Sequence, residues 1–343
     1  MKQTWKQIGS LMLALCMVLT MLPSVALAEE SDIIINEINF PDENFRNWLL
    51  NSSNIGGKGK DGRLTASELT SITDMSVSSK NIANLKGVEH FTALTTLACN
   101  GNKLTELPTA LPSGLTVLNC GINQLTELPE LPSSLTTLSC NSNQLTALPT
   151  MLPSGLTNLH CYGNKLKALP TELPSSLTTL SCNSNQLTEL PTVLPSVLKT
   201  LSCGYNPLTE LPTLPSSLTE LSCSNNQLTE LPTLPSSLTK LYCNANQLTE
   251  LPELPSSLTY LNCSNNNKLT ELPELPSSLI DLNCSYNQLT ELPELRSSLT
   301  DLNCSYNQLT KLTALPSSLI ELRCNGNKLT ALPTALPSGL TEL

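Results

Sequence analysis

Cysteine is the residue whose type and spacing in this sequence could support chemistry. Twelve of the thirteen cysteines recur at a nearly constant interval, at positions 99, 120, 140, 161, 182, 203, 223, 243, 263, 284, 304 and 324. Thiols at a regular spacing can form disulfides, bind a metal or supply a nucleophile. Which of these applies depends on the elements that position them.

Each of these twelve cysteines is the sixth residue of a string L-x-x-L-x-C-x-x-N-x-L, as in residues 135–145. The residues at positions four and six share one face of a strand, and the residues between them point to the other face. A single repeat cannot bury that face, so neighbouring repeats must stack into a parallel sheet. A diverged first repeat at residues 72–77 precedes twelve regular ones, which predicts thirteen strands, and residues 340–343 begin a repeat that is cut short.

This stacking bears on all three kinds of thiol chemistry. Parallel strands in register point their thiols the same way, so a disulfide between neighbours would be strained. A straight row does not converge as tetrahedral metal coordination requires, and a buried thiol is a poor nucleophile. These arguments favour cysteine as a small apolar residue, while an even number of thiols in a secreted chain keeps a disulfide framework as the alternative.

The continuation of each repeat reads L-P-x-L-P-S-S-L or L-P-x-x-L-P-S-G-L. Together with the cysteine string it resembles the leucine-rich repeat, in the short Leu-Pro form of bacterial effectors and of secreted proteins from Gram-positive bacteria. The resemblance covers residues 72–343. It implies an α/β-type solenoid, mostly β, shaped as a horseshoe with parallel concave strands and a small helical N-terminal cap.

The prolines and asparagines of the repeat have structural explanations. Two prolines close together exclude a helix and predict an extended convex side. Repeats differ in length by a single residue between these prolines, so the strand register should survive. Arg296 and Thr313 replace prolines, and an extra Asn interrupts residues 265–267. The asparagine of each repeat should bond buried backbone groups in adjoining turns, a ladder that includes Asn102, Asn123, Asn143, Asn164 and Asn327.

Residues 1–28 are predicted to form a signal peptide. Lys2 and Lys6 precede the apolar run 11–22, and the small-residue motif 26–28 places cleavage after Ala28. Cys16 offers a lipoprotein alternative. No later stretch approaches the ~20 apolar residues of a membrane helix. The mature chain is therefore expected to be secreted or at the cell surface, without a transmembrane segment.

Residues 29–71 are expected to cap the solenoid, with a helix near residues 41–50 and the solenoid itself spanning 72–343. Residues 57–68 resemble an EF-hand loop, but only Asp61 and Glu68 are strong carboxylates where calcium takes six to eight oxygens. Thr65 and Glu68 also form a capping box. We therefore expect no cofactor and keep these two carboxylates as weak metal candidates.

Composition argues against two further functions. The net charge is −10, and no cluster of Lys and Arg is present to bind nucleic acid. The chain has two histidines, His90 and His160, and no glycine-rich phosphate loop, so we expect no enzyme activity. Some effectors that the repeats resemble carry a catalytic domain after them, which leaves a longer effector as an alternative.

The concave face should carry the variable side chains, including every tyrosine of the chain. Tyrosine is an amphipathic anchor common at interfaces, although strands also favour aromatic residues. Charges gather on the later strands. The predicted partner-binding residues are Tyr162, Tyr205, Glu220, Lys240, Tyr242, Tyr260, Asp281, Tyr286, Asp301, Tyr306, Glu321 and Arg323.

These observations predict a secreted or surface-associated interaction protein. Its partner would be a protein of a host or neighbouring cell, bound along the concave arc. The alternatives are a wall-associated adhesive or spacer protein, and the binding part of a longer effector.

Overall fold

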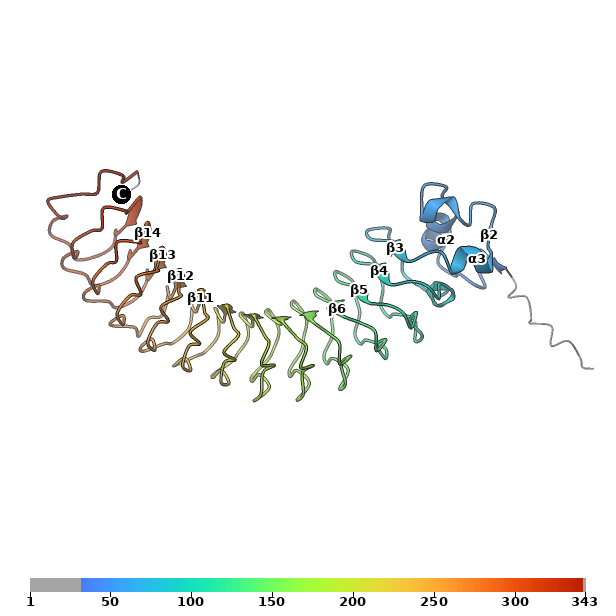
Figure 1. The fold of residues 1–343 in the computed structure, drawn as a ribbon, viewed down its shortest axis with the longest axis horizontal. Helices are drawn as coiled ribbons and strands as arrows, with labels where there is room; N and C mark the ends of the chain where they lie inside the picture. Colours follow the sequence, from blue (N-terminus) through green and yellow to red (C-terminus); the bar gives the residue numbers. More distant parts are fainter. Residues whose placement is uncertain (1–31, 342–343) are drawn as a thin grey trace, which may run out of the picture.

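A computed structural model describes residues 32–341, which form a curved arc with a sheet along its inner side (Figure 1). The predicted signal peptide lies outside the described residues. The sheet has thirteen strands that follow one another in chain order, and every pair is parallel. They are β3 Asp74–Ser76, β4 Thr96–Ala98, β5 Val117–Asn119, β6 Thr137–Ser139, β7 Asn158–His160, β8 Thr179–Ser181, β9 Thr200–Ser202, β10 Glu220–Ser222, β11 Lys240–Tyr242, β12 Tyr260–Asn262, β13 Asp281–Asn283, β14 Asp301–Asn303 and β15 Glu321–Arg323.

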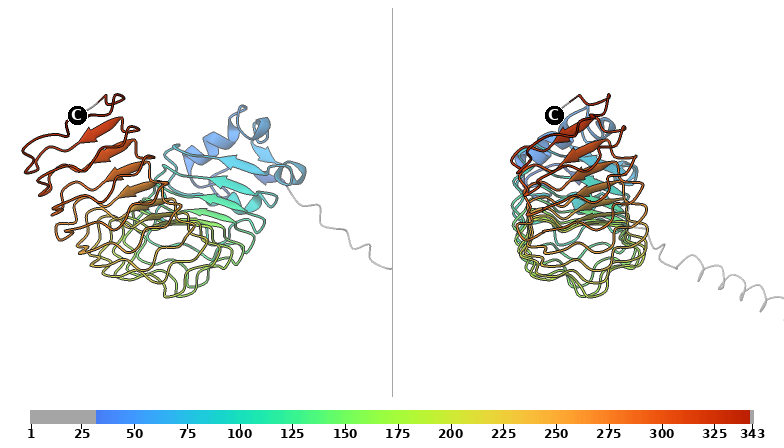
Figure 2. Two further views of the ribbon diagram at one scale, coloured as in Figure 1. Left: turned by 60° about the vertical axis from the view of Figure 1, so that its left-hand side comes forward. Right: turned by 90° about the vertical axis from the view of Figure 1, so that its left-hand side faces the viewer.

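The strands lie side by side along the arc in Figure 2, and their register is constant. The central leucine of each regular strand pairs with the central leucine of the next. Leu118 pairs with Leu138, and Leu138 pairs with Leu159, although the second interval is one residue longer than the first. The length difference is absorbed outside the strands, as the sequence predicts.

The core is a stack of identical layers. Most leucines of the repeat and eleven of the twelve cysteines from Cys99 to Cys324 are buried. Cys324, in the last layer, is partly exposed. The cysteine side chains therefore fill the place that an aliphatic residue would take, in agreement with their interpretation as small apolar residues.

The asparagine ladder bonds adjacent repeats to each other. Asn206 is representative: its side-chain amide donates to the carbonyls of Cys182 and Cys203 at 3.1 and 3.0 Å. Its Oδ1 accepts the backbone N–H of Leu187 at 3.0 Å. One side chain thus satisfies backbone groups in two successive turns, which confirms the structural role predicted for this ladder.

A turn with left-handed backbone follows every strand of the regular repeats. The residue two places after each cysteine has a positive φ, between +53° and +70°. Glycine meets this requirement at Gly101, Gly163 and Gly326. Elsewhere the position holds residues with a side chain, and the sequence alone did not reveal it, because its residue type varies from repeat to repeat.

The convex side is extended backbone and turns, and residues 92–341 contain no helix. In the return segments that keep the second proline, a leucine N–H donates to the carbonyl of that proline, as from Leu135 to Pro132 at 3.1 Å. The second serine of the P-S-S segment reaches back to the previous repeat. Ser134 Oγ, for example, donates to the carbonyl of Leu115 at 2.7 Å. The proline-rich segments therefore add a second line of bonds between repeats.

The extra asparagine is accommodated in a turn. Asn266 keeps its ladder bonds to Cys243 and Cys263. The additional residue extends the loop that follows, where Asn267 and Lys268 are exposed and the N–H of Leu269 donates to the carbonyl of Asn266 at 2.9 Å. The insertion therefore leaves the core layer intact.

The cap consists of short elements at the N-terminal end of the arc: β1 Ile33–Ile34, α2 Glu43–Leu50, the 3-10 helix η1 Ile55–Gly57, β2 Arg63–Leu64 and α3 Ala66–Leu69. A second 3-10 helix, η2 Val88–His90, lies between β3 and β4. β1 and β2 pair antiparallel. The helix expected near residues 41–50 is therefore present, as α2.

Contacts of α2 join the cap to the first repeats. Asp42 Oδ1 accepts the N–H of Phe45 at 2.9 Å and so caps the helix, while Oδ2 accepts the N–H of Ala83 at 2.7 Å. Phe40 packs edge-on against Phe45 and lies over Gly87, where a Cβ would fall 2.2 Å from the ring. Only glycine fits at this contact, where φ is +102°.

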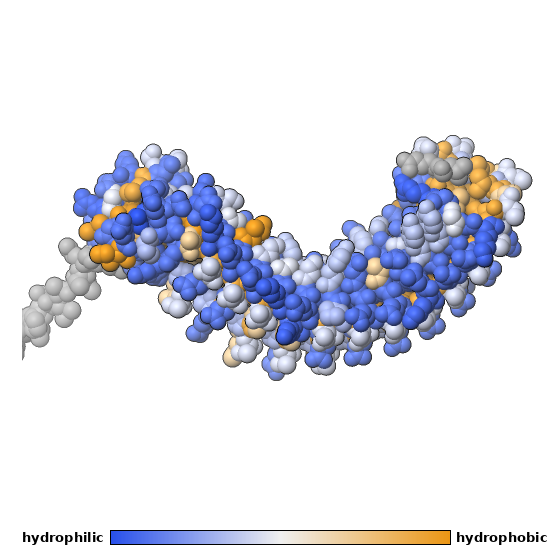
Figure 3. Space-filling model, turned by 180° about the vertical axis from the view of Figure 1, so that it is seen from behind, coloured by the Kyte–Doolittle hydropathy of each residue, from blue (hydrophilic) through white to orange (hydrophobic). Residues whose placement is uncertain are grey.

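The surface is mostly hydrophilic in the view of Figure 3, and hydrophobic side chains gather mainly over the cap and the last repeats. Exposed examples are Ile34 and Ile38 in the cap, and Leu332 and Leu336 at the other end. Within residues 32–341, no helix has the length and apolar character needed to cross a membrane.

Candidate binding face

Each strand presents two side chains to the hollow of the arc. In the pattern x-L-x the central leucine is buried, and the residues on either side of it are in most strands half-buried and turned to the concave side. We call the first residues of the strands the first row and the third residues the second row. Because the register is constant, each row runs straight along the sheet.

The two rows change character along the arc. From β4 to β9 the first row holds Thr96, Val117, Thr137, Asn158, Thr179 and Thr200. From β10 onward it holds Glu220, Lys240, Tyr260, Asp281, Asp301 and Glu321, and the second row adds Tyr242 and Arg323. The structure thus places all the predicted charged residues on concave strand positions, in the C-terminal half.

Two tyrosines meet at the centre of this charged region. The ring centroids of Tyr242 on β11 and Tyr260 on β12 lie 4.7 Å apart. Burial raises the pKa of the Tyr260 hydroxyl, and the nearby Asp281 and Tyr242 raise it further. Both tyrosines are half-buried, so the pair gives the face a fixed aromatic surface.

Three carboxylates stand in line beside this pair. Asp281, Asp301 and Glu321 are register partners on adjacent strands. They line a shallow pocket of about 190 Å³ whose wall also includes Tyr260 and Arg323. Burial raises the pKa of Asp281, as do the neighbouring charges of Asp301 and Glu321, while Arg323 opposes the shift. The guanidinium of Arg323 lies 3.1 Å from the Glu321 carboxylate.

The remaining tyrosines do not share the strand positions. Tyr162 follows Cys161 directly and is half-buried. Tyr205, Tyr286 and Tyr306 occupy the left-handed turn after the strand, with φ of 54°, 55° and 54°. The Tyr286 and Tyr306 rings stack 4.4 Å apart. The predicted tyrosines therefore occupy two kinds of position, on the strands and in the turns that follow them.

The EF-hand-like loop holds its carboxylates in other contacts. Glu68 Oε2 accepts the N–H of Thr65 at 2.9 Å, and Thr65 Oγ1 accepts the N–H of Glu68 at 3.2 Å. This reciprocal pair is the capping box that the sequence suggests. The Asp61 carboxylate lies 3.3 Å from Arg63. Within residues 32–341, no three His, Cys, Asp or Glu side chains are grouped so that they could hold a metal ion.

The thiols lie deep in the core. All twelve described cysteines are free. Burial raises the pKa of the Cys120, Cys203, Cys263 and Cys304 thiols to about 12, and raises that of the other ladder cysteines as well. His160, on the second row, is half-buried, which lowers its pKa, and its Nδ1 lies 3.3 Å from Ser181 Oγ. The burial of the thiols and their raised pKa values do not favour a thiolate nucleophile.

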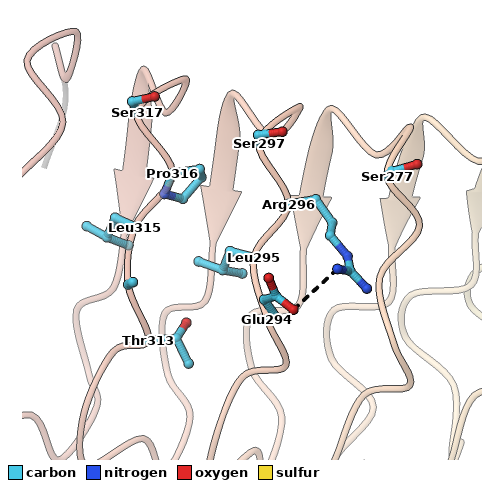
Figure 4. Close-up of a pocket in the computed structure, with 10 residues that line it drawn as sticks. Ser277, Glu294, Leu295, Arg296, Ser297, Thr313, Leu315, Pro316 and Ser317 are labelled. Atoms are coloured by element: carbon cyan, nitrogen blue, oxygen red, sulfur yellow. Dashed lines mark hydrogen bonds and ion pairs between the residues drawn. The ribbon is translucent and has the colours of Figure 1, made fainter.

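Arg296 and Thr313, which replace prolines of the repeat, both line a pocket that the sequence analysis did not predict (Figure 4). It lies on the return segments and has a volume of about 680 Å³. Arg296 Nε donates to the carbonyl of Leu275 at 2.9 Å, and its guanidinium lies 3.3 Å from Glu294. Thr313 Oγ1 is buried without a hydrogen-bond partner. The signal in the sequence was the loss of proline in two consecutive repeats.

Comparison with known proteins identifies the family of the repeats. A model described as "Leucine Rich repeats (2 copies)" matches residues 216–256 and 236–277. No curated protein matches the chain.

Three solved structures are similar over most of the chain. YopM from Yersinia enterocolitica WA-314 is 38% identical with a TM-score of 0.74, and the match covers 79% of this chain and 64% of that one. This chain therefore spans less than two thirds of that protein. The functional domain of InlJ from Listeria monocytogenes, described as including a cysteine ladder, is 29% identical with a TM-score of 0.75, and the match covers 93% of this chain and 76% of that one.

The structure of YopM from Yersinia pestis, described as a leucine-rich effector protein, is matched over most of its length. It is 33% identical with a TM-score of 0.63, and the match covers 79% of this chain and 88% of that one. The repeat length, the parallel concave sheet and this identity agree with one another. The chain therefore belongs to the bacterial leucine-rich-repeat proteins with short repeats.

Proposed function

We propose that this protein binds a partner protein on its concave face and catalyses no reaction. The observation that carries the proposal is the uneven composition of the two rows. Small polar side chains occupy the early strands, whereas aromatic and charged side chains gather from β10 to β15. Tyrosine and arginine are the residue types that most often anchor protein interfaces.

The proposed footprint has a centre and a margin. Its centre comprises Tyr242, Tyr260, Asp281, Asp301, Glu321 and Arg323, which lie on five adjacent strands. Glu220 and Lys240 extend it toward the middle of the arc, and Tyr286 and Tyr306 extend it across the edge of the sheet. Tyr162 and Tyr205 lie further along the arc, as a lesser contact.

The proposal that the protein catalyses no reaction is based on the environment of its thiols and of its concave carboxylates. The ladder thiols are buried and their pKa values are raised, so they are not activated nucleophiles. Asp281, Asp301 and Glu321 line one shallow pocket beside tyrosine and asparagine side chains, without a histidine. A recognition surface accounts for this arrangement more simply than a reaction centre does.

Secretion is part of the proposal as well. Its support is the signal-peptide pattern of residues 1–28 and the similarity to an effector protein and to InlJ, both of bacteria. A protein outside the cell would meet proteins of a host or of a neighbouring cell, and we propose a partner of that kind.

The test compares capture by the protein with capture by two variants. Extracts of host cells and of bacterial surfaces are passed over the immobilised protein. The first variant carries Tyr242→Ala, Tyr260→Ala, Tyr286→Ala and Tyr306→Ala. The matched control carries four changes on early strands, Thr96→Ala, Thr137→Ala, Thr179→Ala and Thr200→Ala.

The proposal expects a captured protein that the tyrosine variant loses and the threonine variant keeps, with unchanged circular dichroism in both. Equal capture by all three proteins would show that the footprint is wrong. A spacer role, or activity elsewhere in a longer protein, would then be the better explanation.

A further inference from the structure

The concave face of the last three strands changes in character from one edge to the other. Ile280 and Ile320, just before β13 and β15, are 46% and 45% exposed. The carboxylates of the first row come next, followed by asparagines of the second row. At the far edge the stacked Tyr286 and Tyr306 are about half exposed. Apolar and aromatic side chains thus flank an acidic strip on both sides.

The acidic strip consists of Asp281, Asp301 and Glu321, and it carries a net negative charge. Arg323 pairs with Glu321. Among the described residues, no ion pair holds Asp281 or Asp301. Neighbouring strands lie about 4.8 Å apart, so these carboxylates repel each other at close range. A cation placed between them would relieve that repulsion.

A cation of a partner protein would also find an aromatic surface. Tyr260 is the register partner of Asp281 and packs against Tyr242. An arginine or lysine side chain held by the carboxylates lies within reach of the Tyr260 ring, where cation–π attraction adds to the ion pair. Exposed apolar side chains at both edges would contact the apolar neighbours of that basic residue.

Building on the proposed binding function, we propose that the concave face over β12 to β15 docks a short helical segment of the partner protein that carries basic side chains beside apolar ones. The two edges, at Ile280 and Tyr286, are six residues apart, and because β13 ends at Asn283 and Tyr286 lies in a turn, at most roughly 20 Å separates them. A helix of about fourteen residues has that length. The charge and the width of the face therefore both fit a short basic amphipathic segment.

The probe is a labelled fourteen-residue peptide of leucine and lysine in an amphipathic helical pattern, and the comparison peptide has glutamate in place of lysine. Binding to the full protein is measured by fluorescence anisotropy. One variant carries Asp281→Asn, Asp301→Asn and Glu321→Gln. The control variant carries Glu230→Gln, Glu250→Gln and Glu271→Gln, three exposed residues of the return segments. It therefore has the same net charge as the first variant.

We expect the lysine peptide to bind the protein at least about tenfold more tightly than the glutamate peptide, and to lose about tenfold in affinity on the concave variant. The control variant should stay within about twofold, and added salt should weaken binding. Equal losses on both variants, or no preference for lysine, would overturn the inference.

This result is separable from the test of the proposed function. A captured partner that depends on the four tyrosines, together with no preference for the lysine peptide, would leave concave-face binding standing and reject a basic segment. Preference for the lysine peptide on the concave strip, with a captured partner that ignores the tyrosines, would reject the proposed footprint and keep the strip as a cation-binding surface.

Discussion

The residue two places after each cysteine adopts a left-handed backbone, whatever its side chain. At Ile122 this conformation, with φ of +53°, is combined with a β-branched side chain that is 58% exposed. Such a conformation costs roughly 1–2 kcal/mol for a residue with a Cβ. Because the side chain is largely in solvent, it recovers little of this through packing.

Ile122→Gly is therefore expected to stabilise the protein by about 0.5–1 kcal/mol, since relief of backbone strain outweighs the added entropy of an unfolded glycine. Ile122→Ala keeps the Cβ and should give a smaller change. Denaturant unfolding of the three proteins measures the difference. A less stable glycine variant would mean that the exposed side chain makes a contact more favourable than the strain.

The raised pKa values of the ladder thiols make stability depend on alkaline pH. A buried thiol with a pKa of about 12 keeps its proton at pH 10, whereas the unfolded thiol has a pKa of about 8.5 and loses it. The stabilisation is complete below the unfolded pKa and is lost as pH rises toward the folded pKa. At pH 10 each such thiol favours unfolding by about 2 kcal/mol.

Summed over the ladder, this term exceeds the whole stability of a typical domain, so we expect cooperative unfolding at or below about pH 10. The variant Cys140→Val, Cys161→Val and Cys182→Val should unfold at a higher pH than the natural protein. Circular dichroism during an alkaline titration gives both midpoints. An unchanged midpoint would assign the transition to other groups.

At the scale of elements, Phe40 and Gly87 form a tight contact between the cap and the first repeats. Gly87 has φ of +102°, and a Cβ there would lie 2.2 Å from Phe40. Gly62 also has a positive φ, of +87°, but a Cβ there would meet nothing within 4 Å. The two glycines therefore separate backbone strain from steric overlap.

Gly87→Ala is expected to displace Phe40 and destabilise the cap by about 2–3 kcal/mol, whereas Gly62→Ala should cost only the backbone term of about 1 kcal/mol. Tryptophan fluorescence follows the cap, because Trp48 packs beside Phe45. Equal effects of the two substitutions would show that Phe40 can move aside without cost.

The elements were largely predictable from sequence because their determinants are local and repeated. The period gives the strands, the paired prolines exclude convex helices, and the amphipathic pattern of residues 41–50 gives the cap helix. The candidate site was less predictable. The alternation of a strand places Tyr260 and Asp281 correctly, but it stops at the cysteine, so Tyr286 and Tyr306 lie in a turn. The pocket beside Arg296 and Thr313 depends on contacts between successive repeats, which no single repeat encodes.

At the scale of the whole molecule, each repeat bonds only its two neighbours. Removal of residues 158–178 would join Thr157 to Thr179 and preserve both the strand register and the ladders. It would also remove Tyr162 and His160. Because β12 to β15 lie several repeats away, their face should be unaffected.

We expect this shortened protein to fold and to bind the lysine peptide within about twofold of the full chain, since distant sites act independently. Circular dichroism and anisotropy provide the two readouts. Reduced peptide binding by a folded protein would show that the early repeats contribute to the same surface.

The constant strand register also has a consequence for how the number of repeats can change during evolution. Because every repeat meets its neighbours through the same contacts, an unequal crossover that adds or removes one whole repeat in the coding sequence gives a chain that still closes its core. Such events change the distance between the cap and the C-terminal face while leaving the composition of that face alone. Descendants of this gene should therefore differ in length by steps of one whole repeat, with the early, uniform repeats gained and lost most freely.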